Sequence, residues 1–208
     1  NANGTFTSRP TTVSGGHAAV YEVRDVNGDA RPDVIGFYPG YGKTVERRRL
    51  NNGDGSFAAQ NVPHARPAGL PAAVVAQLDA FVADTSAVNR FCGPIFWEQD
   101  INGDGHGDCL IRYFGGYTDL AHTRGWVLLR NPEGTLEDKT DALGIKGMPY
   151  PAQDFTGDGR LDLYTSHAPG SGLWVQQANG TFLNSNVELG AFASTRQDYP
   201  QRFWATDL

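Results

Sequence analysis

Three short segments of the chain carry oxygen-bearing side chains at the same four positions. They read "DVNGDARPD" from Asp25, "DINGDGHGD" from Asp100 and "DFTGDGRLD" from Asp154. Positions 1, 5 and 9 are always aspartate, and position 3 is asparagine or threonine. Carboxylates this close together repel one another unless a cation neutralises them, and donor sets made only of oxygen suit hard cations. The spacing therefore indicates a cation-binding loop, written three times.

Calcium fits these loops better than magnesium, because a flexible loop with many oxygens suits its roughly six to eight ligands. The glycines between the acids allow the sharp backbone path, and position 7 is expected to contribute its carbonyl oxygen. Thr156 makes the third loop the weakest, since a hydroxyl is a poorer ligand than an amide carbonyl. We expect about three structural Ca²⁺ ions, with ligands at Asp25, Asn27, Asp29, Arg31, Asp33, Asp100, Asn102, Asp104, His106, Asp108, Asp154, Thr156, Asp158, Arg160 and Asp162.

Two other interpretations of the same spacing compete with this one. An EF-hand requires a bidentate glutamate at position 12 and a helix on each side. Position 12 here is Gly36, Ile111 or Thr165, and the flanking residues are strand-like, so the EF-hand is rejected. The second is a solvated Asx turn, in which Asp and Asn side chains bind their own backbone. Repetition of the spacing in three loops favours the cation.

A second motif alternates with the acidic loops and predicts tight hairpins. It reads "NANGTF", "NGDGSF", "NPEGTL" and "QANGTF", each with a glycine where a positive φ is expected. Short apolar runs of strand length, such as "PIFWEQ" and "GWVLLR", flank both motifs. Each unit thus contains an acidic loop, two strands, a Gly turn and a further strand. Units of this kind are typical of a β-propeller or another repeat array.

We therefore expect an all-β single domain, a partial or small propeller-type repeat array of about four blade units. One interruption lies around residues 63–90, where "LPAAVVAQLDAFVAD" predicts a short inserted helix with Pro71 near its start. A further unit begins at the end of the chain, because "FWATDL" repeats "FWEQDI". The units run near residues 1–24, 25–99, 100–153 and 154–206, with 207–208 beginning the next.

The acidic loop, the apolar strand after it and the following Gly turn together resemble the FG-GAP or VCBS-type repeats. These repeats occur in integrin α-subunit-like β-propellers and in many secreted bacterial and fungal proteins. The resemblance covers most of the chain apart from residues 63–90. It implies a four-stranded blade per repeat, calcium in the loop between strands and an extracellular location. Family propellers usually have about seven blades, whereas this chain holds about four units.

The chain also starts inside one unit and stops at the start of another, which leaves strand edges to be covered. It is expected to be part of a longer repeat protein, to close on itself, or to associate head to tail with other copies. The net charge of −6 argues against a nucleic-acid partner. No apolar run is long enough to span a membrane.

Four residues leave covalent chemistry open. Cys92 and Cys109 form either one disulfide or two buried thiols, and a secreted protein favours the disulfide. Asn3 and Asn179 stand in N-G-T sequons. They either carry glycans or serve turn geometry alone.

No nucleophile elbow, P-loop or metal-spaced histidine pair is present, so we expect no enzyme activity. The function predicted is a secreted calcium-binding scaffold for adhesion or surface assembly. One alternative is an accessory domain of a polysaccharide-active enzyme, with Glu98 as an acid if burial raises its pKa. Another is a carbohydrate-binding lectin, whose stacking platforms would come from Trp97, Trp126, Trp174, Trp204 or the aromatic segments 36–42 and 112–119.

Overall fold

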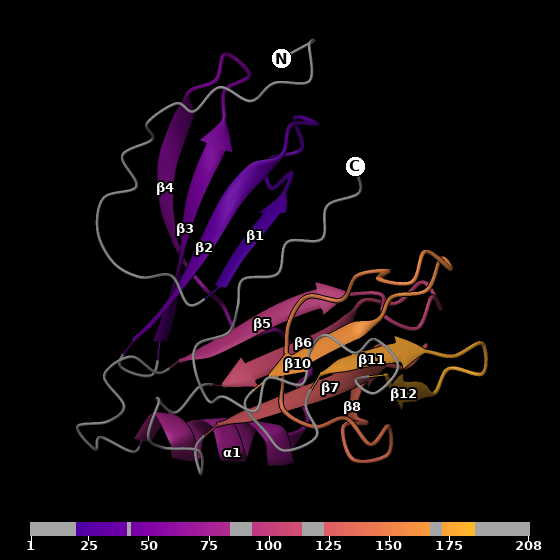
Figure 1. The fold of residues 1–208 in the computed structure, drawn as a ribbon. Helices are drawn as coiled ribbons and strands as arrows, with labels where there is room; N and C mark the ends of the chain where they lie inside the picture. The colour runs from indigo at the N-terminus through magenta and orange to yellow at the C-terminus, as the bar shows by residue number, and fades with distance from the viewer. Residues whose placement is uncertain (1–19, 41–42, 84–92, 114–122, 167–171, 186–208) are drawn as a thin grey trace.

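A computed structural model describes residues 20–40, 43–83, 93–113, 123–166 and 172–185 (Figure 1). These residues form three four-stranded antiparallel sheets and one helix. The prediction of a β-rich repeat array with one inserted helix is confirmed for this part of the chain. The described residues do not form a closed propeller. The expected first unit up to residue 19 and the repeat near the end lie outside them.

The strands of each sheet pair in chain order. The first sheet contains β1 (Val20–Arg24), β2 (Asp33–Gly40), β3 (Lys43–Asn51) and β4 (Phe57–Pro63). The second contains β5 (Pro94–Gln99), β6 (Asp108–Tyr113), β7 (Arg124–Arg130) and β8 (Leu136–Asp138). The third contains β9 (Met148–Pro149), β10 (Leu163–Ser166), β11 (Leu173–Gln176) and β12 (Phe182–Asn184).

All three sheets share one internal plan. An acidic loop joins the first strand to the second, and a Gly turn joins the third strand to the fourth. The strand before each acidic loop therefore belongs to the same sheet as the strand after it. In the second sheet, for example, Gln99 at the end of β5 pairs with Asp108 at the start of β6. We call the loops Asp25–Asp33, Asp100–Asp108 and Asp154–Asp162 the first, second and third loops.

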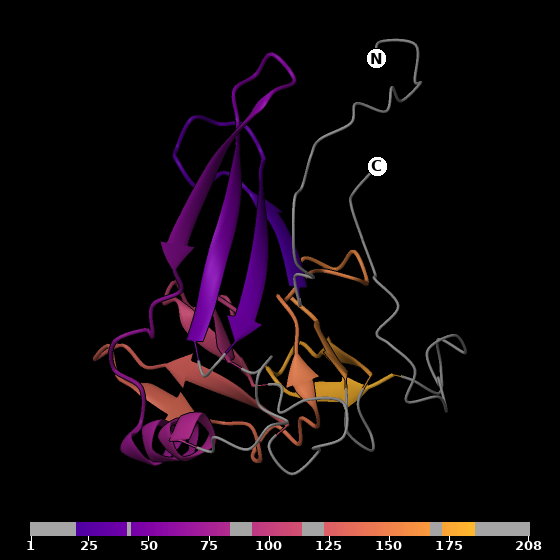
Figure 2. The same cartoon turned by 90° about the vertical axis from the view of Figure 1, so that its left-hand side faces the viewer.

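The helix α1 (Ala72–Ala83) covers one face of the second sheet (Figures 1 and 2). Pro71 precedes it, and its carbonyl accepts the first helical hydrogen bond from the Val75 N–H at 3.0 Å. Val74 and Leu78 are buried and pack in one cluster with Trp126 of β7. Because α1 occupies this face, the first sheet meets the second along β5 instead. Among the described residues, no helix has the length and apolar character that crossing a membrane requires.

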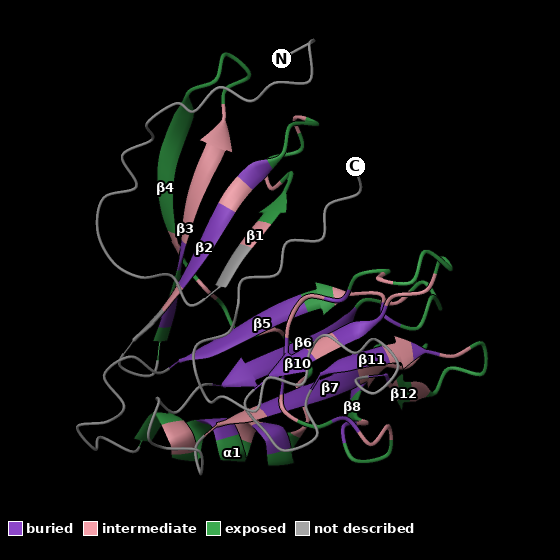
Figure 3. Ribbon diagram, in the orientation of Figure 1, coloured by how far each residue is buried: buried purple, intermediate pink, exposed green. Residues whose placement is uncertain are grey.

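The opposite face of the second sheet forms a core shared by all three sheets. Phe37 of β2, Trp97 of β5 and Leu163 of β10 belong to this one cluster. The rings of Phe37 and Trp97 meet edge to face at 5.9 Å. Figure 3 shows the consequence: the second sheet is buried along most of its length, whereas β4 is almost wholly exposed. The second sheet is thus the centre of the structure.

Two glycines allow the sheets to approach closely. A Cβ on Gly93 would lie 2.5 Å from the carbonyl oxygen of Lys43, where the first and second sheets meet. A Cβ on Gly125 of β7 would overlap Pro149 and lie 2.9 Å from the Cα of Met148, where the second and third sheets meet. Neither neighbour can give way easily, because both contacts involve backbone atoms.

We expect Gly125→Ala to lower the free energy of unfolding by about 1–3 kcal/mol, because the added methyl forces β7 and β9 apart. Gly107→Ala is the matched control, since a Cβ there meets nothing within 4 Å. Urea unfolding of both variants measures the difference. Equal stability of the two variants would contradict the close approach of the second and third sheets.

A buried polar contact joins the first and second sheets. The N–H of Phe96 in β5 donates to Nε2 of His64 at 2.8 Å, so the ring proton must be on Nδ1, which donates to Glu46 Oε1 at 2.7 Å. Arg48 also pairs with Glu46 at 2.7 Å. Burial raises the pKa of Glu46, but the bonds from His64 and Arg48 outweigh it and hold the pKa below the ordinary value of 4.5. His64 looks like a loop residue in the sequence, so this role was not foreseen.

We expect Glu46→Gln to destabilise the protein at pH 7 by about 1–3 kcal/mol. A carboxyl whose folded-state pKa is lowered stabilises the fold above its ordinary pKa and loses that contribution as the pH falls. The gap between wild type and Glu46→Gln should therefore close as a pH series of melts passes below 4.5. Glu22→Gln is the control, for which the opposite change in stability is expected. Burial raises the pKa of Glu22, whose Oε2 has no partner, so this variant should be stabilised at pH 7.

Candidate metal-binding loops

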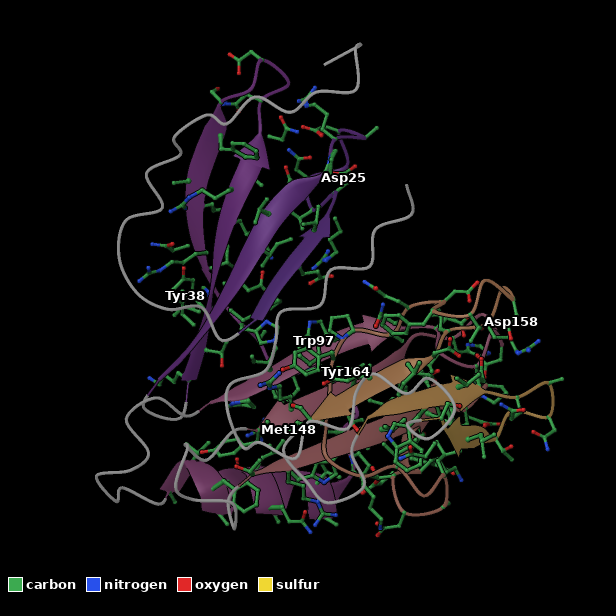
Figure 4. The ribbon with its side chains drawn as sticks, in the orientation of Figure 1. Asp25, Tyr38, Trp97, Met148, Asp158 and Tyr164 are labelled. Carbon is green, nitrogen blue, oxygen red and sulfur yellow. The ribbon has the colours of Figure 1, made fainter. Side chains whose placement is uncertain are left out.

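The three acidic loops lie at separate places, one in each sheet (Figure 4). Asp25 in the first loop and Asp158 in the third mark two of them in that view. The first and second loops begin directly after β1 and β5, whereas the third begins at Asp154, after β9 has ended at Pro149; the ninth residue of each loop lies at or beside the start of the second strand. Each is therefore an independent candidate site, and its residues are compared below by position.

The position 1 carboxylate organises each loop by accepting backbone N–H groups. In the second loop, Asp100 Oδ1 accepts from Gly103 at 2.8 Å and Oδ2 accepts from Gly105 at 2.9 Å. Asp25 and Asp154 accept from positions 4 and 6 in the same way. These bonds lower the pKa of Asp154. Burial acts to raise the pKa of Asp25, but the backbone bonds outweigh it and lower that pKa too.

Position 9 is an inward clamp rather than an open ligand. The three aspartates there, Asp33, Asp108 and Asp162, are each 0% exposed. Asp108 Oδ2 accepts the Ile101 N–H at 2.9 Å, and its Oδ1 accepts the Arg130 N–H at 2.8 Å. Burial raises the pKa of Asp108 above the ordinary value despite these bonds. The same pair of bonds ties position 2 of the loop to the end of the third strand in the other two sheets.

The residues at positions 3 and 5 are exposed, apart from Asp29, whose side chain is 24% exposed. In the second loop, Asp104 Oδ1 accepts the His106 N–H at 2.8 Å and Oδ2 accepts Nδ2 of Asn102 at 2.9 Å. These two hydrogen bonds lower the pKa of Asp104. In the first loop, Asp29 binds Asn27 in the same way but also pairs with Arg31 at 2.6 Å. Positions 3 and 5 thus carry the oxygens that face solvent.

An arginine completes each loop, although not from the same position. Arg31 pairs with Asp29, and its Nε donates to the carbonyl of Asn51 at 2.8 Å. Arg160 pairs with Asp158 and donates to Gln176 in the same way. The second loop has His106 at position 7, and Arg130 of β7 reaches back instead, its Nε donating to the Gly107 carbonyl at 2.6 Å. The sequence predicted only a carbonyl ligand at position 7, and the role of these side chains was missed.

Position 6 has left-handed backbone in all three loops. Gly105 and Gly159 adopt φ of 87° and 84°, as the glycine-rich pattern predicts. Ala30 occupies this position in the first loop with φ of 63°. A residue with a Cβ is strained there, so the first loop keeps the shared shape at a cost of about 1–2 kcal/mol. The loop shape is therefore imposed by its hydrogen bonds and not by glycine alone.

The donor types of the loops fit a hard cation, but their present grouping is not a formed metal site. Within the described residues, no three His, Cys, Asp or Glu side chains are grouped to hold a metal ion. The position 9 carboxylates bind backbone N–H groups, while position 5 binds an arginine or an asparagine. The loops as they stand satisfy the Asx-turn interpretation, and the calcium ligand set remains a prediction.

The tryptophans proposed as sugar platforms do not lie on the surface. Trp97, Trp126 and Trp174 are 4%, 0% and 7% exposed and belong to the two core clusters. In the aromatic segments, Tyr113 is 1% exposed, and Tyr38 lies under the guanidinium of Arg47 at 4.0 Å. Trp204 and most of segment 112–119 lie outside the described residues.

Glu98 and Cys109 have settings that the sequence left open. The Glu98 side chain is 57% exposed, with Arg130 at 3.4 Å, so it does not have the buried setting expected of a glycosidase acid. Cys109 is a free buried thiol, and burial, with help from Glu98, raises its pKa to about 12. Of the two alternatives, the buried thiol describes Cys109, whereas Cys92 lies outside the described residues. Asn179 is exposed in its turn, and Asn3 is not described.

Comparison with known proteins adds no relative. No family model matches the sequence, and neither a curated protein nor a solved structure gives a significant match.

The buried aspartate at position 9 and the exposed aspartate at position 5 are expected to differ in their effect on stability in metal-free buffer. In EDTA, we expect Asp108→Ala to destabilise the protein by about 1–3 kcal/mol for each of the two buried N–H groups that lose their acceptor. Asp104→Ala should change stability far less, because its carboxylate is exposed. Chemical denaturation measures both. A larger loss in Asp104→Ala than in Asp108→Ala would show that position 9 is not the structural clamp.

Proposed function

We propose that the chain is a calcium-binding repeat module of the FG-GAP or VCBS type, which acts outside the cell as a scaffold for adhesion or surface assembly. The observation that carries the proposal is the recurrence of one acidic loop at the same place in three sheets, with the same hydrogen bonds at positions 1 and 9. A turn that served only to connect two strands does not require aspartate at three of the same four positions in every copy. Repeated charge of one sign is a cost that a bound cation removes.

The residues of each loop would have different roles in binding calcium. Positions 1 and 9 already fix the backbone, so they pre-organise the loop around its centre. Position 3 in all three loops, and position 5 in the second and third, offer exposed oxygens that solvent cations can reach. When bound, Ca²⁺ would offset the negative charge of the aspartates at positions 1 and 5, next to the buried aspartate at position 9. The ion would thereby stabilise the sheets by mass action rather than take part in a reaction.

The second loop is the strongest of the three candidates. Its position 5 carboxylate, on Asp104, is bound by Asn102 and a backbone N–H and has no arginine partner among the described contacts. In the first and third loops, Arg31 and Arg160 already neutralise the corresponding carboxylates. A calcium ion must displace these guanidinium groups. The third loop has both an arginine and Thr156 in place of asparagine, so it should bind last.

We expect native mass spectrometry to count about three calcium ions per chain, which EDTA removes while lowering the melting temperature. Asp104→Ala should lose the tightest ion. Arg31→Gln should tighten binding by up to about fivefold, because an exposed ion pair contributes about 0.2–1 kcal/mol. Arg24→Gln is the matched control, since Arg24 pairs with Glu22 outside the loop. Wild type that binds no calcium at millimolar concentration, with a melt unchanged by EDTA, would leave these loops as Asx turns.

Assembly is supported by two exposed valines on one face of the first sheet, which also carries Arg47 and Arg49. Val23 of β1 and Val45 of β3 lie on the same face of the first sheet and are 53% and 39% exposed. A sheet face of this kind is a candidate surface for another repeat or another copy of the chain. The same mass spectra report the oligomeric state. A ladder of oligomers in calcium supports head-to-tail association, and a monomer at all concentrations supports a module of a longer protein.

A further inference from the structure

The most unusual charge in the structure is an arginine buried without a counter-ion. Arg112 of β6 is 3% exposed, and its Nε and Nη1 atoms are enclosed without a hydrogen-bond partner. In the described part of the chain, no carboxylate lies within ion-pair distance of it. Removing a guanidinium from water is costly unless the charge is paired and its N–H groups are satisfied. Among the described residues, no negatively charged group compensates this charge.

The surroundings of Arg112 are the junction of the second and third sheets. Its backbone pairs with Ile95 of β5 and with Gly125 of β7, the glycine that lets β9 approach. Its guanidinium carbon lies 4.5 Å from the centre of the Tyr150 ring, directly after β9. That cation–π contact accommodates the charge but accepts none of the N–H bonds. The ring of Tyr164 lies 5.5 Å from Tyr150, and burial raises the pKa of Tyr164.

Two further hydrogen-bond donors here also have no acceptor. The hydroxyl of Tyr150 and Nε1 of Trp97 are enclosed and unpartnered. Trp97 lies two residues from Ile95, so it occupies the same face of the second sheet as Arg112. Figure 4 labels Trp97 and Tyr164 in this part of the molecule. Among the described residues, the junction thus contains a positive charge and several buried hydrogen-bond donors that have no acceptor.

The nearest candidate for an internal acceptor does not serve it. Glu22 is the one buried carboxylate among the described residues with an unpartnered oxygen. Its charged neighbours are Arg24, Glu46 and His64 of the first sheet, and Arg112 is not one of them. None of the described carboxylates therefore pairs with Arg112.

We propose that the junction of the second and third sheets binds a small oxyanion, a carboxylate or an inorganic anion such as sulfate, through Arg112 and the hydroxyl of Tyr150. Oxygen acceptors with negative charge are what a guanidinium and a phenol recognise, and charge-assisted bonds of this kind are strong. The anion must be small, because Arg112 is only 3% exposed. Its binding would join β6 to the residues that follow β9, and would thereby lock the third sheet onto the second.

Isothermal titration with sodium acetate and with sodium sulfate, each at constant ionic strength against sodium chloride, tests this site. Wild type should bind at least one of them saturably, and the preferred one identifies the source as a carboxylate or an inorganic oxyanion. Arg112→Met should weaken binding at least tenfold, and Tyr150→Phe should weaken it several-fold while keeping the ring beneath the guanidinium. Arg124→Met is the matched control. Arg124 also stacks on an aromatic ring, that of Trp126 at 5.3 Å, and this variant should bind like wild type.

A melt in chloride provides a second readout. With no anion to pair it, the buried charge destabilises the fold, so Arg112→Met should melt higher than wild type in chloride. Saturating anion should raise the melting temperature of wild type and leave that of Arg112→Met at its chloride value. Absence of saturable binding by wild type, or equal binding by wild type and Arg112→Met, would overturn the proposal. Loss of calcium binding in a separate titration would not overturn the proposal, since the anion site and the acidic loops share no residue.

Discussion

The position 9 aspartate is the interaction on which the repeated architecture depends. In each sheet it starts or precedes the second strand, is wholly buried, and accepts one N–H from the loop before it and one from the end of the third strand. A single carboxylate thereby connects the acidic loop, the start of the second strand and the end of the third strand through backbone N–H groups. Asparagine could not replace it without placing an amide N–H against a backbone N–H. The residue that gives the loop its acidic appearance is thus also what holds the sheet together.

The arginines show how the same loop is held by different residues. In the first and third loops, the guanidinium at position 7 binds the carbonyl of the residue whose N–H the clamp accepts. In the second loop, that residue is itself Arg130, and its side chain reaches back to the loop. The arginine therefore comes from the loop in the first and third sheets and from the third strand in the second sheet. In all three sheets it joins the acidic loop to the end of the third strand. This difference also leaves Asp104 without a guanidinium partner, which makes one of three similar loops electrostatically distinct.

The sequence predicted those parts of the fold whose signals are local. Apolar runs such as "PIFWEQ", the Gly turns and the helix after Pro71 correspond closely to β5, the third-to-fourth strand connections and α1. It did not predict how the sheets meet, because that depends on contacts between distant residues. Gly125 and His64 carry no local pattern, yet one admits β9 and the other joins β5 to Glu46. At the loops, the spacing identified the right residues but did not distinguish a ligand from a clamp, since aspartate serves as both.

The two sheet junctions handle buried charge in opposite ways. Between the first and second sheets, Glu46 is surrounded by donors from His64 and Arg48, so its charge is satisfied within the chain. Between the second and third sheets, Arg112 has an aromatic ring beneath it, and its Nε and Nη1 find no acceptor among the described residues. If residue 112 served only to hold the two sheets together, an apolar side chain would be expected there. A well-packed hydrophobic side chain stabilises a core at least as well as an unpaired charge does. The first junction is therefore complete as it stands, whereas the second has the chemistry of a place that an anion completes.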